Sequence, residues 1–130
     1  MKKLVSIHIV SMIILLSTCQ NQDLKFVGES ENWSAEVTVT QTDGDEQYKI
    51  QISYKGNELE SIKTFDYFVE TTTNGVLNFG ANNVSLNENG MYHNKSLSSN
   101  SPSTKQEEKL VLKVEWNGLT ESFVLGNFVN

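Results

Sequence analysis

Hydrophobic and polar residues alternate with a period of two along most of the chain after residue 26, and no helical period is present. The alternation is clearest around Asp43-Gly44, a residue pair that favours a two-residue type I′ hairpin turn. If these two residues form the turn, the numbers of facing residues sum to 87, and every apolar side chain falls on one face. The facing apolar pairs are Trp33 with Tyr54, Ala35 with Ile52, Val37 with Ile50 and Val39 with Tyr48. This one-sided pattern predicts an antiparallel sheet packed on a core.

A second hairpin is predicted around Asn117-Gly118, where the numbers of facing residues sum to 235. Its apolar face pairs Trp116 with Leu119, Leu112 with Phe123 and Leu110 with Leu125. Val114 faces Glu121, the one acid on this face. Glu121 is therefore expected either at the rim of the sheet or in a functional role.

Shorter and weaker alternations predict further strands over residues 62–70, 76–79 after Asn74-Gly75, 84–86 and 91–94. About seven or eight short strands at intervals near 8 to 12 residues predict an all-β domain. The expected architecture is an antiparallel two-sheet sandwich with immunoglobulin-like architecture, and a small β-barrel is the alternative. Residues 26–130 are predicted to form this single domain, and the serine-rich stretch 96–106, which holds the only proline, a mobile loop.

The first residues have the pattern of an export signal. Two lysines precede an apolar run over residues 4–16, which ends in Leu16, Ser17 and Thr18 before Cys19, the only cysteine. The run is shorter than the roughly 20 residues that span a bilayer as a helix. The alternatives are a core segment and an ordinary buried thiol.

This segment resembles the signals of bacterial lipoproteins, in which a diacylglyceryl group joins the cysteine sulfur and a peptidase cuts just before that residue. Thr18 departs from the Gly, Ala or Ser that usually stands there. The resemblance implies that residues 1–18 are removed, that Cys19 carries the lipid, and that residues 19–25 form a polar tether. Two acyl chains make a stable anchor, so the expected location is the extracytoplasmic face of the cell membrane.

Charge narrows the choice of partners. The chain has a formal net charge of −6, and removing two lysines with the signal leaves eight lysines against sixteen acids, or 8 − 16 = −8, with no arginine. Nucleic acid is not expected as a partner, because its recognition depends on Arg and Lys. Anionic headgroups would repel this surface, so the lipid is expected to hold the protein to the membrane.

Catalytic and metal-binding motifs are not found in the sequence. His93 is the only histidine after the signal, and lipidation would convert the only thiol to a thioether. Phosphate loops, H-E-x-x-H and a glycine-flanked serine elbow are missing. The acids in 43–46 are of the type that calcium prefers, but they lack the spacing of an EF-hand loop and are expected to form a solvated turn. We therefore predict no catalytic residue, no metal ligand and no cofactor beyond the lipid.

Residues 28–33 and 115–118, with Glu121 and Phe123, resemble small uncharacterised lipoproteins of Gram-positive bacteria. This resemblance implies no activity. Glu29, Glu31 and Glu121 are candidate contact residues; the alternative places Trp33 inward and makes the first two a charged strand edge that blocks unwanted pairing.

Three functions follow as hypotheses. The first is a non-catalytic binding or adaptor module that contacts an envelope protein, a cell-wall polymer or an exported ligand. The second is an assembly subunit of a larger envelope complex that pairs through a strand edge. The third is a small carboxylate-dependent hydrolase. A concave pocket with convergent polar groups would favour the first, and a long flat sheet edge the second.

Overall fold

The computed structural model describes residues 22–72, 77–99 and 104–127, and these form an all-β domain of antiparallel strands, as predicted. A single short 3-10 turn, η1 (Leu59–Ser61), interrupts the strands in these ranges. The strands are β1 (Gln22–Glu29), β2 (Trp33–Thr42), β3 (Asp45–Tyr54), β4 (Phe65–Thr71), β5 (Asn78–Val84), β6 (Met91–His93), β7 (Leu97–Ser99), β8 (Lys109–Trp116) and β9 (Leu119–Gly126).

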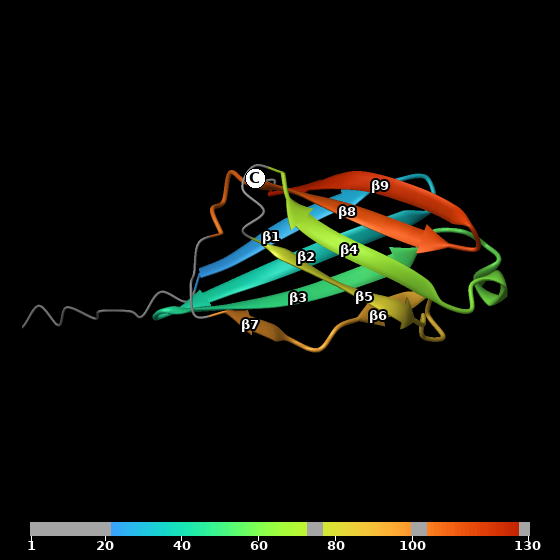
Figure 1. Ribbon diagram of the computed structural model, residues 1–130, viewed down its shortest axis with the longest axis horizontal. Helices are drawn as coiled ribbons and strands as arrows, with labels where there is room; N and C mark the ends of the chain where they lie inside the picture. Colours follow the sequence, from blue (N-terminus) through green and yellow to red (C-terminus); the bar gives the residue numbers. More distant parts are fainter. Residues whose placement is uncertain (1–21, 73–76, 100–103, 128–130) are drawn as a thin grey trace, which may run out of the picture.

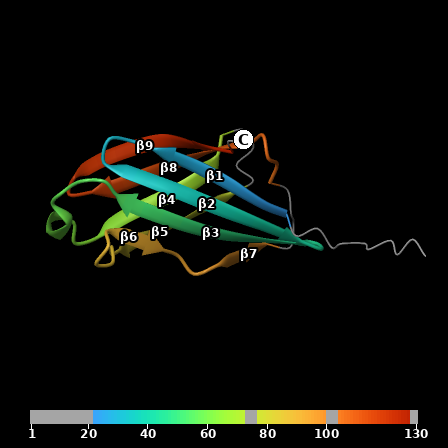
Figure 2. The same cartoon turned by 180° about the vertical axis from the view of Figure 1, so that it is seen from behind.

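All nine strands belong to one hydrogen-bonded sheet. Its order is β5-β4-β8-β9-β1-β2-β3-β6, and β7 also pairs with β3. The sheet bends so that β4, β5 and β8 lie over β1, β2 and β3, with the core between them (Figures 1 and 2). At the open side, the Tyr92 ring of β6 lies 5.8 Å from Phe65 and 5.4 Å from Tyr67 of β4, centroid to centroid. The sheet is thus nearly closed, so the barrel alternative fits and the two-sheet sandwich is not confirmed.

The sheet folds over at the junction of β1 and β9. These strands pair through Val27 and Gly126. Beside this pair, a Cβ atom on Gly28 would lie 2.2 Å from the carbonyl oxygen of Val124. Such an approach excludes any side chain, so a glycine is required where β1 meets β9.

Both predicted hairpin registers are confirmed. Trp33 faces Tyr54 in the first hairpin, and Leu110 faces Leu125 in the second. Asn117 and Gly118 have φ values of 47° and 74°, as a type I′ turn requires. In the first turn only Gly44, at 81°, has a positive φ, so the predicted type I′ geometry is wrong for Asp43-Gly44 although the register is right. A favoured turn residue pair and a one-sided apolar pattern, when they agree, fix the register.

Several predicted boundaries differ from the structure. Among the weaker strands, β4 begins at Phe65 and not at residue 62, and β5 ends at Val84, so residues 85 and 86 lie outside any strand. β1 begins at Gln22 and buries Leu24, so residues 22–25 belong to the sheet and not to the predicted tether. Within the predicted mobile loop 96–106, β7 pairs with β3 and Thr104 is buried. Residues 22–25 and 96–106 are polar apart from single apolar side chains, so hydrophobic alternation does not mark them as strands. Residues 22–25 pair with residues 38–41 of β2, and residues 97–99 pair with residues 46–48 of β3. The signal 1–18, Cys19, the Asn74-Gly75 turn and residues 100–103 lie outside the described residues.

Trp33 occupies the centre of the core and is completely buried, as expected for its inward position. Its ring lies 5.0 Å from Phe65, 5.3 Å from Tyr54 and 5.4 Å from Trp116, centroid to centroid. Each such aromatic pair contributes about 0.5–1.5 kcal/mol beyond the area it buries. These contacts join both halves of the bent sheet. In the described ranges, no helix has the length and apolar character needed to cross a membrane.

Candidate functional site

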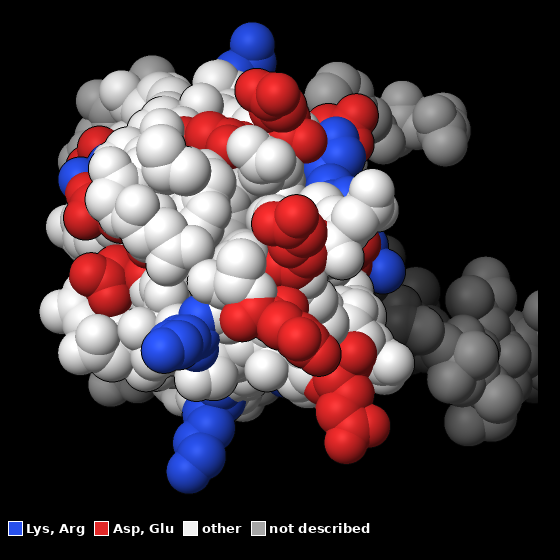
Figure 3. All heavy atoms as spheres, turned by 90° about the vertical axis from the view of Figure 1, so that its right-hand side faces the viewer, with Lys and Arg blue, Asp and Glu red and all other residues white. Residues whose placement is uncertain are grey.

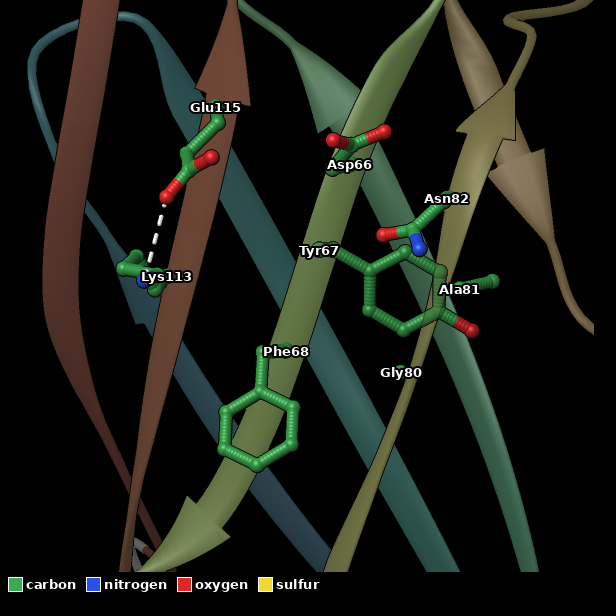
Figure 4. A pocket seen from close by; sticks show the side chains of 8 residues that line it. All are labelled: Asp66, Tyr67, Phe68, Gly80, Ala81, Asn82, Lys113 and Glu115. Atoms are coloured by element: carbon green, nitrogen blue, oxygen red, sulfur yellow. Dashed lines mark ion pairs between the residues drawn. The ribbon is translucent and has the colours of Figure 1, made fainter.

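The outer face of the sheet is hollowed where β4, β5 and β8 run side by side (Figure 4). β4 alternates strictly, with Phe65, Tyr67 and Val69 buried in the core. Phe68 therefore points outward, and 37% of it is exposed to solvent. Its ring lies in a hollow of about 410 Å³. An exposed aromatic ring in a concave surface is a candidate ligand contact.

Gly80 keeps one side of Phe68 open. It faces Phe68 on β5, and a Cβ at this position would lie 2.3 Å from the carbonyl oxygen of Tyr67. No side chain fits at position 80, so none can cover Phe68 from there. On the other side, Lys113 faces Phe68 on β8, and its ammonium lies 3.0 Å from the carboxylate of Glu115 (Figure 4).

Polar groups line the hollow above the ring. Asp66 and Glu115 face each other across β4 and β8, and Asn82 stands on β5 (Figure 4). Asp66 Oδ1 accepts a hydrogen bond of 2.8 Å from the backbone N–H of Asn83. The pairing of β4 with β5 shifts register here, and Asn83 has a positive φ of 54°. Such bulges are common beside binding sites because they redirect backbone and side-chain groups.

A second hollow of about 420 Å³ adjoins the first, because Asp66 and Glu115 line both. It continues to the β8–β9 turn, where Asn83, Asn117 and Thr120 line it. The two hollows form one groove that is aromatic at one end and polar at the other. We call it the Phe68 groove.

The predicted contact residues Glu29, Glu31 and Glu121 lie at the end of the sheet that holds the β1–β2 turn. Glu121 accepts hydrogen bonds from the hydroxyl of Ser30, from the Asn32 backbone N–H at 2.9 Å and from Asn32 Nδ2 at 2.6 Å. Burial raises the pKa of Glu121, but these hydrogen bonds and the charge of Lys55 outweigh it and hold the pKa below its ordinary value. Glu121 therefore fixes the β1–β2 turn.

Glu29 and Glu31 are exposed, and Lys55 Nζ lies 3.2 Å from Glu29 Oε2. The interpretation of these acids as guards of a strand edge is wrong, because β1 lies between β2 and β9. Glu29 also lines a wider hollow, of about 640 Å³, on the outer face of β1, β2 and β3. No aromatic ring lines that hollow, and its other carboxylate, Glu36, lies 3.7 Å from Lys25 Nζ.

The solvated turn expected over residues 43–46 is confirmed for Asp43, Gly44 and Asp45, which are exposed, but not for Glu46, which is completely buried. Its carboxylate accepts hydrogen bonds from the Thr104 hydroxyl, Tyr48 Oη at 2.7 Å, Gln41 Nε2 at 2.8 Å and the Thr104 backbone N–H at 3.2 Å. Burial raises the pKa of Glu46, but these bonds outweigh it and lower the pKa overall. Burial, with the neighbouring Glu46, raises the pKa of Tyr48 to about 12. Within the described ranges, no group of three His, Cys, Asp or Glu side chains could hold a metal ion.

Acidic side chains gather at the end of the molecule where the Phe68 groove reaches the turns (Figure 3). They belong to the loops that join β3 to β4 and β5 to β6, and to the β1–β2 turn. The exposed acids there are Glu29, Glu31, Glu58, Glu60 and Glu88. This surface would repel an anionic ligand.

Sequence reasoning did not identify the Phe68 groove. The alternation of residues 62–70 carries a signal for it, since it places Phe68 on the face opposite Phe65 and Tyr67. No family model, curated protein or solved structure matches this chain. The candidate site is therefore defined by the geometry of its own residues.

Proposed function

We propose that the protein is a non-catalytic binding module of the cell envelope, anchored to the membrane by a diacylglyceryl group on Cys19, that binds its ligand in the Phe68 groove. The observation that carries this proposal is the 37% exposed Phe68 ring within a concave, otherwise polar surface. Binding sites combine apolar contact area with a few oriented polar groups. Phe68 supplies the first, and Asp66, Asn82 and Glu115 supply the second.

The groove stands on a rigid base. Phe68 is paired on both sides, with Gly80 of β5 and with Lys113 of β8, and its neighbours Tyr67 and Val69 are buried in the core. The backbone that carries the ring is therefore fixed before a ligand binds, and such preorganisation favours affinity.

The position of the anchor agrees with this use of the groove. β1 starts at Gln22, opposite Gln41 and beside the β2–β3 turn, at one end of the long axis (Figure 1). The groove extends to the β8–β9 turn at the other end. A lipid on Cys19, shortly before Gln22, would therefore hold the bilayer at the end remote from the polar part of the groove.

The assembly hypothesis, in which a strand edge pairs with another protein, has less support. β6 and β7 have three residues each, and β5 carries Gly80 and the bulge at Asn83. Short and irregular edges are poor templates for added strands. The groove, by contrast, is the kind of feature that favours a binding module.

Site-specific photocrosslinking in cells tests the proposal. Benzoylphenylalanine in place of Asn82, in the groove, should give an ultraviolet-dependent adduct in the membrane fraction. The matched control places the same residue at Lys49, an exposed outward position on β3. Equal adducts at both positions, or none at position 82, would contradict the proposal.

A further inference from the structure

The chemistry of the Phe68 groove narrows the class of ligand. We infer that it binds a linear glycan of uncharged sugars, an inference that rests on the binding function proposed above. Three properties of the groove lead to it: one open aromatic ring, an array of short hydrogen-bonding side chains, and an elongated shape with acidic surroundings.

The aromatic ring matches one face of a sugar. A pyranose presents a flat face of C–H groups, which packs against an aromatic ring and buries apolar area, while its hydroxyls project sideways. Phe68 offers a ring that neither Gly80 nor the Lys113 ammonium, held by Glu115, closes off. A ligand that is apolar throughout would leave the carboxylate and amide groups of the groove without partners.

The polar groups match the hydroxyls. Asn82 and Asn83 carry amides that both donate and accept, and the carboxylate of Asp66 accepts. Asn117 Nδ2 already donates to the carbonyl oxygen of Ser61 at 3.0 Å, which orients this amide and leaves its Oδ1 as an acceptor for the ligand. The backbone N–H of Asn83 binds Asp66 Oδ1 at 2.8 Å and thereby orients this carboxylate. Hydroxyl groups, which donate and accept, can satisfy both kinds of partner at once.

Charge and position argue against the other polymers. The groove is lined by two carboxylates, Asp66 and Glu115, and by one cation, Lys113, which already forms an ion pair with Glu115. The net charge of the lining is therefore negative and would repel an anionic polymer. A peptide that adds a strand needs a free sheet edge. The groove lies instead on the outer face of β4, β5 and β8, where Phe68 is paired on both sides, and the one edge strand among them, β5, is interrupted by the bulge at Asn83.

The length of the groove suits a chain and not a single sugar. Two hollows of about 410 and 420 Å³ adjoin at Asp66 and Glu115, and Phe68 lines only the first. One sugar unit can therefore stack on Phe68 while the following units occupy the polar hollow toward Asn117.

Calorimetric titration of the full-length protein in detergent micelles tests the inference, with β-1,4-linked tetramers of glucose and of N-acetylglucosamine as probes. We expect at least one tetramer to bind, and Phe68→Ala to weaken binding by about tenfold or more. Phe68→Tyr, which keeps the ring, should restore the affinity. Val124→Ala removes an apolar side chain that is 52% exposed outside the groove and should leave binding unchanged.

The outcomes separate the ligand class from the binding function. The glycan inference is overturned if neither tetramer binds, or if Phe68→Ala binds as wild type. Binding of a lysine tetrapeptide that depends on Phe68, without glycan binding, overturns the glycan class but leaves the groove as a binding site. If none of these probes binds and position 82 gives no crosslink, both the glycan inference and the proposed binding function of the groove are overturned.

Discussion

Substitution of Glu46 separates the contribution of its charge from that of its hydrogen bonds. The Tyr48 and Thr104 hydroxyls donate to Oε1, and Gln41 Nε2 and the Thr104 N–H donate to Oε2. In Glu46→Gln, the amide oxygen can keep the two N–H donors. The new NH₂ can donate to the two hydroxyls, because a hydroxyl also accepts. Every buried polar group then retains a partner.

The two variants Glu46→Gln and Glu46→Ala should differ in stability. Hydrogen bonds to an ionised group are roughly twice as strong as neutral ones, while removing the charge also removes the cost of burying it. We therefore expect Glu46→Gln to lower the free energy of unfolding at neutral pH by about 1–2 kcal/mol. Glu46→Ala leaves the Thr104 N–H without its acceptor and opens a cavity. At about 1–3 kcal/mol for each unsatisfied group, its cost should exceed about 3 kcal/mol.

The same variants should change the response to acid. The pKa of Glu46 in the fold lies below its ordinary value of 4.5, so ionisation stabilises the protein above that value. This stabilisation is lost as the pH falls through the folded pKa, because the unfolded chain then binds the proton more readily. Glu46→Gln should therefore lose less stability than wild type as the pH falls below 4.5.

Urea denaturation followed by tryptophan fluorescence measures both effects, because Trp33 and Trp116 lie in the core. Glu70→Gln, which changes an exposed glutamate on β4, is the matched control and should behave as wild type at neutral pH. Equal destabilisation by Glu46→Gln and Glu46→Ala would refute the hydrogen-bond reasoning. Wild-type stability of both would refute the anchoring of Thr104 by Glu46.

Four further predictions concern other positions. Cys19→Ser should give an uncut precursor or a released domain in detergent partitioning, and wild-type partitioning at wild-type mass would contradict the lipid anchor. Calcium should raise the melting temperature no more than salt does, because the acids of the β2–β3 turn are not expected to form a calcium site. A bound ion at a hundred times its Kd would stabilise the fold by about 2.7 kcal/mol, so a calcium-specific rise that is lost in Asp45→Asn would contradict this prediction. Trp116→Ala should cost about 3–5 kcal/mol in chemical denaturation, and wild-type stability would mean that Trp116 is exposed. Glu121→Gln should lower the free energy of unfolding by about 1 kcal/mol, because its hydrogen bonds to Asn32 become weaker. Because the pKa of Glu121 is lowered in the fold, the variant should also lose less stability in acid than wild type. An unchanged dependence of stability on pH would argue against the role of the Glu121 carboxylate in fixing the β1–β2 turn.

The hairpins could be predicted because their information is local. Asp43-Gly44 and Asn117-Gly118 each set a turn, and the alternation on both sides of each turn allows one register only. The closing of the sheet could not be predicted in this way. It depends on the contact of Gly28 with Val124, two positions that no local pattern connects.

The candidate site was missed for the same reason. Phe68 faces outward by alternation alone, but the groove exists because Gly80 and Lys113, from two other strands, stand beside it. In the sequence, Glu46 resembles a residue of a polar turn. Its burial depends on contact with Thr104, which lies 58 positions away along the chain. Local patterns thus predict which face a side chain occupies, whereas a site depends on pairings across the sheet.

The place of β1 in the sheet determines when the domain can be completed. β1 is the first described strand along the chain, yet it lies beside the last, and the pair Val27 and Gly126 joins positions 99 residues apart. If the chain is exported as proposed, with residues 22–29 crossing before residues 119–126, β1 keeps one open edge until residue 126 has followed. Contacts over such separations form slowly. If Cys19 is lipidated as proposed and is processed before residue 126 has crossed, its processing takes place on a chain whose β1–β9 junction is still open.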